Sequence, residues 1–164
     1  MSKREVLLNA LTATPSDLER LLKSVDDSHL TYRPTPDEWS IADVLCHLVM
    51  VEQQGLTRLQ RMVTERPSTI PAIYPDAAMH DLTQPTTTFL INFRQARQTM
   101  LAFLRELKAG DWQVTAVHPT LGNLSVRSLV QHHVDHDTAH LNQIGEIRER
   151  ELASSPISNL QSPP

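Results

Sequence analysis

Histidines gather near the C-terminal end of this chain of 164 residues. Four of its eight histidines fall within nine residues, from His132 to His140. His136 and His140 are four residues apart, so in a helix their rings would lie about 5–6 Å apart on one face. At this separation two imidazoles can bind one metal ion at adjacent coordination positions. Core histidines paired with hydrogen-bond acceptors can show the same spacing, so the pattern alone leaves both interpretations open.

The segment 125–147 is predicted to form the helix that carries these histidines. Ser125 is a favourable N-cap, and apolar residues follow it at helical spacing. At about 100° per residue, one side of this helix combines histidines with apolar residues: Leu129, His133, His136, His140, Ile144 and Ile147. That side must be buried. His133 could therefore be a ligand, a partner of a ligand or a core residue, whereas His132 lies at the edge and is expected in solvent.

A metal site in a helical bundle needs a further ligand from a facing helix. His47 is the only other histidine inside a predicted helix, and it lies about 40–60° from the buried positions Val44 and Val51. His47 is therefore the candidate third ligand. Three imidazoles would leave coordination positions open, which is typical of catalytic rather than structural sites.

Other chemically active side chains are expected to have ordinary structural roles. Asp135 and Asp137 could orient histidines as hydrogen-bond acceptors, but we expect both to face solvent. Cys46 is expected to be a small core residue. Three further histidines fall in predicted loops and are expected at the surface: His29, His80 and His118.

Four amphipathic helices are predicted from the spacing of apolar residues: 3–24, 40–64, 86–109 and 125–147. Pro15 should kink or break the first of these. Ser40 with Asp43 can cap the start of the second helix, and Trp39 can pack against its first turn. Gly110 is a natural C-cap for the third. This set of helices predicts an all-α fold, a four-helix bundle.

The segments between the helices are long enough to matter for function. The connections 65–85 and 111–124 are expected to be crossovers or loops over a binding site. The bundle is predicted to span residues 1–152 as one domain. The polar, proline-containing segment 153–164 is predicted to be a disordered tail.

Composition narrows the classes of partner. A net charge of −4 gives no basic surface for nucleic acid. No apolar stretch is long enough for a membrane span, and the first residues lack the pattern of a signal peptide. The single cysteine, Cys46, excludes an internal disulfide. We therefore expect a cytoplasmic protein with neither a nucleic-acid nor a membrane partner.

Four stretches of the chain resemble signatures of the DinB/YfiT-like superfamily, in the family's order and spacing: 11–15, 39–48, 118–126 and 136–144. The resemblance implies an up-down-down-up four-helix bundle, often dimeric, with a divalent metal held by three histidines. The matching positions are His47, His136 and His140. Zinc or nickel is the expected metal, and iron is a further candidate. His133 is an additional histidine that the family pattern does not require.

The resemblance also implies a choice of functions. Known relatives use low-molecular-weight thiols, as thiol S-transferases or as a thiol-dependent isomerase, and others carry only the name metal-dependent hydrolase. We expect first a transferase in which the metal lowers the pKa of a bound small thiol. Alternatives are a hydrolase that uses a metal-activated water and a module that binds a metal or a partner without catalysis.

No catalytic residue can be assigned from the sequence. Glu52 could accept a proton in a hydrolase, although it lies about 140° from His47 around the helix. Arg58 lies about 20° from the direction of His47 and nearly three turns further on, so it could face an anionic group of the substrate.

Overall fold

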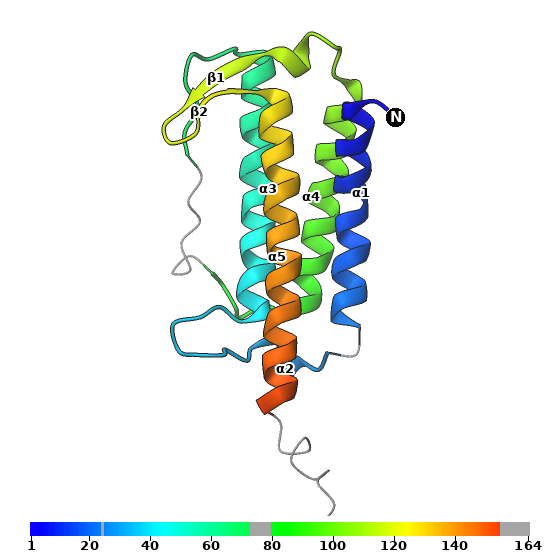
Figure 1. Cartoon of the computed structure of the whole chain (residues 1–164), viewed down its shortest axis with the longest axis vertical. Helices are drawn as coiled ribbons and strands as arrows, with labels where there is room; N and C mark the ends of the chain where they lie inside the picture. Colours follow the sequence, from blue (N-terminus) through cyan, green and yellow to red (C-terminus); the bar gives the residue numbers. More distant parts are fainter. Residues whose placement is uncertain (24, 73–79, 155–164) are drawn as a thin grey trace, which may run out of the picture.

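The computed structural model describes residues 1–23, 25–72 and 80–154 of the chain. Four long helices form a bundle (Figure 1): α1 (Lys3–Leu22), α3 (Ile41–Thr64), α4 (Thr86–Glu106) and α5 (Val126–Ser154). The smaller elements lie in the connections: the short helix α2 (Asp27–Leu30), the 3-10 helix η2 (Asp111–Gln113) and the strands β1 (Thr115–His118) and β2 (Gly122–Ser125). The prediction of a four-helix bundle is confirmed.

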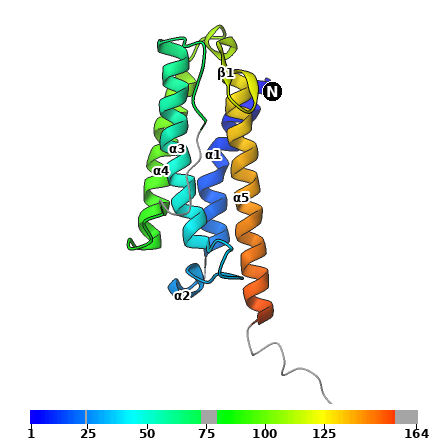
Figure 2. The same ribbon diagram turned by 90° about the vertical axis from the view of Figure 1, so that its left-hand side faces the viewer.

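The order of the helices around the bundle places α3 beside α5. Helix α1 contacts α4 and α5, and α3 contacts the same two helices. Helices α1 and α5 run in one direction, and α3 and α4 run in the other (Figures 1 and 2). This is the up-down-down-up topology. Because α3 and α4 are parallel, the chain between them must return along the length of the bundle.

Helix α3 begins as the sequence predicts. The Ser40 side chain accepts a hydrogen bond from the Asp43 N–H at 3.2 Å, and the Asp43 carboxylate accepts one from the Ser40 N–H at 2.9 Å. Each residue thus satisfies a backbone N–H that would lack a partner inside the helix. Both residues are buried, so this capping box fixes the start of α3 inside the protein.

The predicted break at Pro15 is absent, because α1 continues through this residue. Proline lacks an N–H, so the carbonyl of Leu11, four residues earlier, has no donor within the helix. The Arg97 side chain of α4 supplies one, with Nη1 2.9 Å from the Leu11 oxygen. A tertiary hydrogen bond therefore replaces the one that proline removes.

The end of α4 and the segment after it differ from the prediction. The helix ends at Glu106, and Leu107 turns away in an extended conformation instead of the chain reaching a cap at Gly110. Asp111 accepts a hydrogen bond from the Lys108 N–H at 2.8 Å, which stabilises the new turn. The predicted loop that follows contains a two-stranded antiparallel sheet of β1 and β2.

The C-terminal end is only partly described. Helix α5 continues to Ser154, two residues beyond the predicted domain boundary, and the remainder of the predicted tail lies outside the described residues. Among the helices described, none combines the length and the apolar character that crossing a bilayer requires.

A group of buried charges joins all four helices. Arg97 of α4 forms two hydrogen bonds with the Glu52 carboxylate of α3, at 2.7 and 2.8 Å, and one with Asp137 of α5, at 2.7 Å. Thr14 of α1 donates to Asp137 at 3.0 Å, and His133 of α5 donates to Glu52 at 2.7 Å. We call these five residues the Arg97 network. The prediction that Asp137 faces solvent is wrong, because its carboxylate is the buried partner of Arg97.

The Arg97 network keeps Glu52 and Arg97 ionised although both residues are buried. Burial alone would raise the pKa of Glu52, but hydrogen bonds from His133 and Arg97 and the charge of Arg97 lower it to about 2. Burial would lower the pKa of Arg97, but the two carboxylates raise it. Glu52 therefore remains an ionised carboxylate, and its oxygens accept the hydrogen bonds that join α3 to α4 and α5.

Candidate metal centre

Three histidine side chains meet between α3 and α5. The Nε2 atom of His136 lies 3.1 Å from Nε2 of His47 and 3.2 Å from Nε2 of His140. One ligand atom from each of these residues falls within 4.8 Å of the others. The structure thus brings together the three histidines that the sequence singles out, one from α3 and two from α5.

The protonation of these rings suits a metal ion. Burial, together with the charges of His140 and His47, lowers the pKa of His136 to about 3. Burial also lowers the pKa of His140. Both rings are therefore neutral at physiological pH, which is the form that binds metals.

The hydrogen bonds of His140 show which of its nitrogens faces the centre. Its Nδ1 lies 2.7 Å from Oε1 of Gln143, an acceptor, so Nδ1 carries the proton and Nε2 keeps its lone pair. Separations of 3.1 and 3.2 Å are close to the about 3.0–3.4 Å expected between imidazoles that share one ion at about 2.0–2.1 Å. The three residues fit a divalent transition metal.

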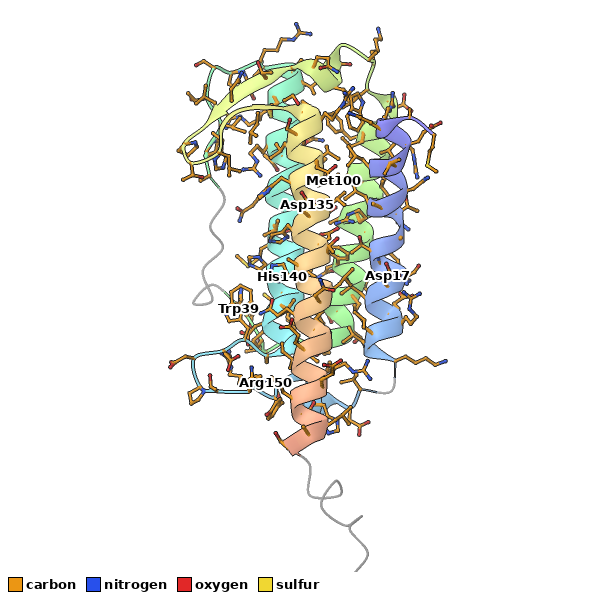
Figure 3. All side chains as sticks on the ribbon, viewed as in Figure 1. Asp17, Trp39, Met100, Asp135, His140 and Arg150 are labelled. Carbon is orange, nitrogen blue, oxygen red and sulfur yellow. The ribbon has the colours of Figure 1, made fainter. Side chains whose placement is uncertain are left out.

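Trp39 forms one wall of this centre. Its ring lies 4.9 Å from the His47 ring and 6.1 Å from the His140 ring, nearly parallel to the latter. Figure 3 labels Trp39 and His140 on the same side of the bundle. Because Trp39 directly precedes the Ser40 cap, the start of α3 also positions an apolar surface beside the histidines. That surface limits the access of water to the centre.

His80 also lies at the centre, contrary to the expectation that it is a surface residue. Its side chain is only 1% exposed, and its ring lies 6.2 Å from that of His47 and 5.0 Å from that of Trp39. Nδ1 lies 3.1 Å from the Asp43 carboxylate, which also pairs with Arg33. Nε2 is buried and has no hydrogen-bond partner among the residues described.

The remaining histidines are not placed as ligands. His133 donates from Nε2 to Glu52, so it belongs to the Arg97 network and not to the metal centre. His132 is exposed, and the His29 side chain is 45% exposed at the surface, as predicted. His118 is buried, contrary to its prediction, because its Nδ1 accepts hydrogen bonds from the backbone N–H groups of Thr120 and Leu121.

Two other sequence predictions at the centre have definite outcomes. Cys46 is a buried core residue, as expected, and burial raises the pKa of its thiol. Asp135 is exposed, also as expected. Neither residue belongs to the group of possible metal ligands among the described residues.

The fold and the site define a four-helix bundle in which three histidines of two facing helices could hold a metal ion, and sequence comparison specifies the family. The sequence profile of the DinB superfamily matches residues 10–144. The chain belongs to the DinB superfamily. YuaE of Bacillus subtilis is 26% identical over 144 residues, which cover 79% of this chain and 89% of that protein. A Bacillus mycoides protein that carries the name "putative metal-dependent hydrolase" is 23% identical, over 83% of this chain and 80% of its own.

Solved structures share the fold at lower identity. YfiT from Bacillus subtilis, described as "a probable metal-dependent hydrolase with an unusual four-helix bundle topology", aligns with a TM-score of 0.79 at 22% identity, over 92% of this chain and 90% of its own. A mycothiol-dependent maleylpyruvate isomerase aligns with a TM-score of 0.70 at 12% identity, over 92% of this chain and 67% of its own. At these identities the likeness shows the fold alone.

Proposed function

We propose that this protein is a metal-dependent transferase that acts with a low-molecular-weight thiol. The observation that carries the proposal is the meeting of three imidazoles from two helices, with one ligand atom of each within 4.8 Å of the others. His47, His136 and His140 would hold a divalent ion, zinc or nickel by preference and iron as a further candidate. Such an ion lowers the pKa of a thiol or water molecule bound to it and so supplies a nucleophile at neutral pH.

The state of Glu52 favours a thiol over water. A hydrolase needs a group that accepts a proton near the ion, and Glu52 is the carboxylate on α3 that the sequence offers for this role. Its oxygens bind Arg97 and His133 instead, and it is fully buried. A thiol that binds an ion loses its proton outright and needs no such partner. The mycothiol dependence of a protein with the same fold agrees with this choice.

His80 favours the alternative function, a metal-dependent hydrolase. Asp43 holds its Nδ1, so Nε2 is the nitrogen with a lone pair beside the His47 ring. An imidazole held by a carboxylate in this way can accept a proton from water. The hydrolase names of a relative and of YfiT agree with this alternative. A third candidate, a module without catalysis, remains if neither reaction occurs.

Two assays on metal-loaded protein separate the candidates. The first follows conjugation of a chromogenic electrophile by several cellular thiols, and the second follows hydrolysis of ester, amide and phosphoester substrates with and without chelator. The transferase is expected to conjugate a thiol and to lose this activity in His136→Ala but not in His132→Ala, the exposed control on the same helix. No turnover with any thiol would refute the transferase.

The variant His80→Gln tests the choice between the two reactions. It is expected to leave thiol conjugation within about threefold of the wild type. If His80 is the base of a hydrolase, the same variant should lower ester hydrolysis by about 10²-fold or more. We expect the protein to act on a small molecule in the cytoplasm and to form a homodimer. Sedimentation of the purified protein tests whether it is a homodimer.

A further inference from the structure

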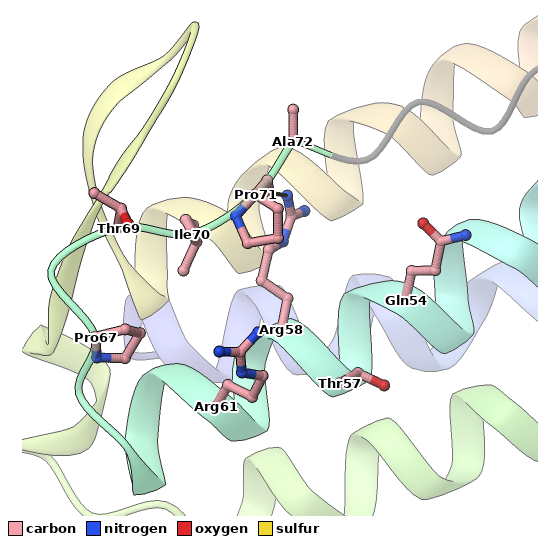
Figure 4. A pocket seen from close by; sticks show the side chains of 9 residues that line it. All are labelled: Gln54, Thr57, Arg58, Arg61, Pro67, Thr69, Ile70, Pro71 and Ala72. Atoms are coloured by element: carbon pink, nitrogen blue, oxygen red, sulfur yellow. Dashed lines mark hydrogen bonds between the residues drawn. The ribbon is translucent and has the colours of Figure 1, made fainter.

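A pocket of about 240 Å³ lies beside the C-terminal half of α3 (Figure 4), and none of the three histidines lines it. Nine residues of α3 and of the segment 67–72 line it: Gln54, Thr57, Arg58, Arg61, Pro67, Thr69, Ile70, Pro71 and Ala72. Strand β1 holds this segment in place, because Val117 exchanges backbone hydrogen bonds with Ser68 and Ile70 at 2.9 and 3.0 Å. The wall of the pocket is therefore fixed by the hairpin.

Arg58 is the buried cation of this pocket. The residue is 9% exposed and extends beneath Pro71, whose carbonyl accepts from Nη1 at 3.3 Å (Figure 4). Its Nε is buried and has no hydrogen-bond partner among the described residues. No described carboxylate pairs with Arg58, and burial lowers the pKa of its guanidinium.

A buried guanidinium without a carboxylate is costly, so its presence calls for a partner. The neighbouring Arg61 does not share this state, because it is half exposed and pairs with Glu65 at 3.1 Å. Burial and the positive charge of Arg58 lower the pKa of His118, a buried residue of β1. Two arginines thus line this pocket, and no described carboxylate pairs with the buried one.

The pocket lies on the same side of α3 as the metal centre. Arg58 follows His47 by eleven residues, which corresponds to about 16 Å along the helix and a rotation of about 20°. A small molecule with one end at the three histidines could therefore reach Arg58 with the other. The segment 67–72 supplies a mostly apolar wall opposite the polar and charged side chains of α3, as is usual for a pocket that binds one charged group of a small ligand.

We propose that the Arg58 pocket binds the carboxylate or phosphate group of a small molecule. The guanidinium would donate from Nε and from its outer nitrogens, a geometry that suits planar or tetrahedral anions. The role of this group as the remote end of the substrate rests on the proposed function. The binding of the anion itself does not, and it can be measured without turnover.

Direct titration tests the pocket. Inorganic phosphate and acetate are added in separate experiments to metal-loaded protein, with acetamide as a neutral control, while ¹H–¹⁵N spectra follow the arginine Nε–H groups. The signal of Arg58, identified by its loss in Arg58→Gln, is expected to shift with phosphate, with acetate or with both, and not with acetamide. An Arg58 signal that responds to none of them, or equally to acetamide, overturns the proposal.

Matched variants separate Arg58 from its neighbour. Arg58→Gln is expected to weaken anion binding about tenfold or more, because it removes charge-assisted hydrogen bonds. Arg61→Gln is expected to weaken it by about twofold or less, because Arg61 is exposed and already paired. An equal loss in both variants would show a diffuse effect of surface charge and would overturn the assignment to Arg58.

Two further measurements test whether a loss of binding reflects misfolding and whether anion binding depends on the metal centre. Phosphate or acetate is expected to raise the thermal midpoint of the wild type but not of Arg58→Met, and Arg58→Lys, which keeps the charge, should bind with intermediate affinity. The variant His136→Ala should bind the anion as well as the wild type does. Thiol conjugation without anion binding would overturn this proposal and leave the proposed function standing. Anion binding at Arg58 without thiol conjugation would support this proposal and refute the transferase.

Discussion

Replacing Arg97 of α4 with methionine should cost a large part of the stability of the bundle. The side chain is 0% exposed and makes hydrogen bonds to Glu52, Asp137 and the Leu11 carbonyl. Arg97→Met keeps much of the volume but leaves two buried carboxylates without their cation. Breaking a buried ion pair in this way costs about 3–5 kcal/mol, a large part of the about 5–15 kcal/mol that stabilises a typical domain.

The pH dependence of this loss gives a sharper test than its size. In the wild type the pKa of Glu52 is lowered from 4.5 to about 2, so this group contributes about 3 kcal/mol above pH 4.5 and loses it as the pH falls towards 2. In Arg97→Met the Glu52 carboxylate stays buried without the guanidinium that lowers its pKa, so burial raises this pKa and folding favours the uptake of a proton by Glu52. The unfolding free energy of Arg97→Met, relative to that of the wild type, therefore rises as the pH falls.

Urea denaturation of both proteins with chelator present, between pH 5 and pH 8, measures this difference. The gap in unfolding free energy is expected to be largest at pH 8 and to narrow towards pH 5. Arg94→Met is the matched control, because Arg94 lies on the same helix but pairs with Glu19 at half-exposed positions. It should change stability by about 1 kcal/mol or less at every pH. A gap that is constant with pH, or a loss no larger than that of the control, would refute the reasoning.

Substitutions at Gly55 and Ser40 test the packing and the capping of α3. In Gly55→Ala the new Cβ would lie 2.9 Å from Cε1 of His133, so denaturation should show a loss of about 1–3 kcal/mol in unfolding free energy. The control Gly145→Ala on α5, whose Cβ would have nothing within 4 Å, should gain about 0.5–1 kcal/mol. A stabilised Gly55→Ala would contradict the close packing of His133. Ser40→Ala should lose about 1–2 kcal/mol in the same assay, because it removes the N-cap bond to Asp43, and an unchanged midpoint would contradict that role.

The helices and the three histidines could be predicted because both follow from periodicity. Spacing of three and four residues places His136 and His140 on the buried side of α5, and the capping residues mark where α3 begins. His47 followed as the only other histidine inside a predicted helix, and the family resemblance added the order of the helices. The helices and the spacing of the histidines depend on residues that are close in the sequence, so one sequence is enough to predict them.

Features that depend on distant partners were not predictable. Nothing near Pro15 shows that Arg97, on another helix, would donate a hydrogen bond to the free Leu11 carbonyl and keep α1 continuous. Aspartate is usually a surface residue, and Asp137 can lie in the core because Arg97 pairs with it. His80 lies in a segment without periodicity, so no local signal places it against Asp43 and the metal centre.

The metal content of the purified protein tests the central claim most directly. After dialysis against zinc or nickel, elemental analysis should find about one ion per chain in the wild type and in the exposed control His132→Ala. His47→Ala, His136→Ala and His140→Ala should each lose most of it. A wild type that retains no ion, or a His136→Ala variant that retains as much as the wild type, would contradict a metal centre held by these three histidines.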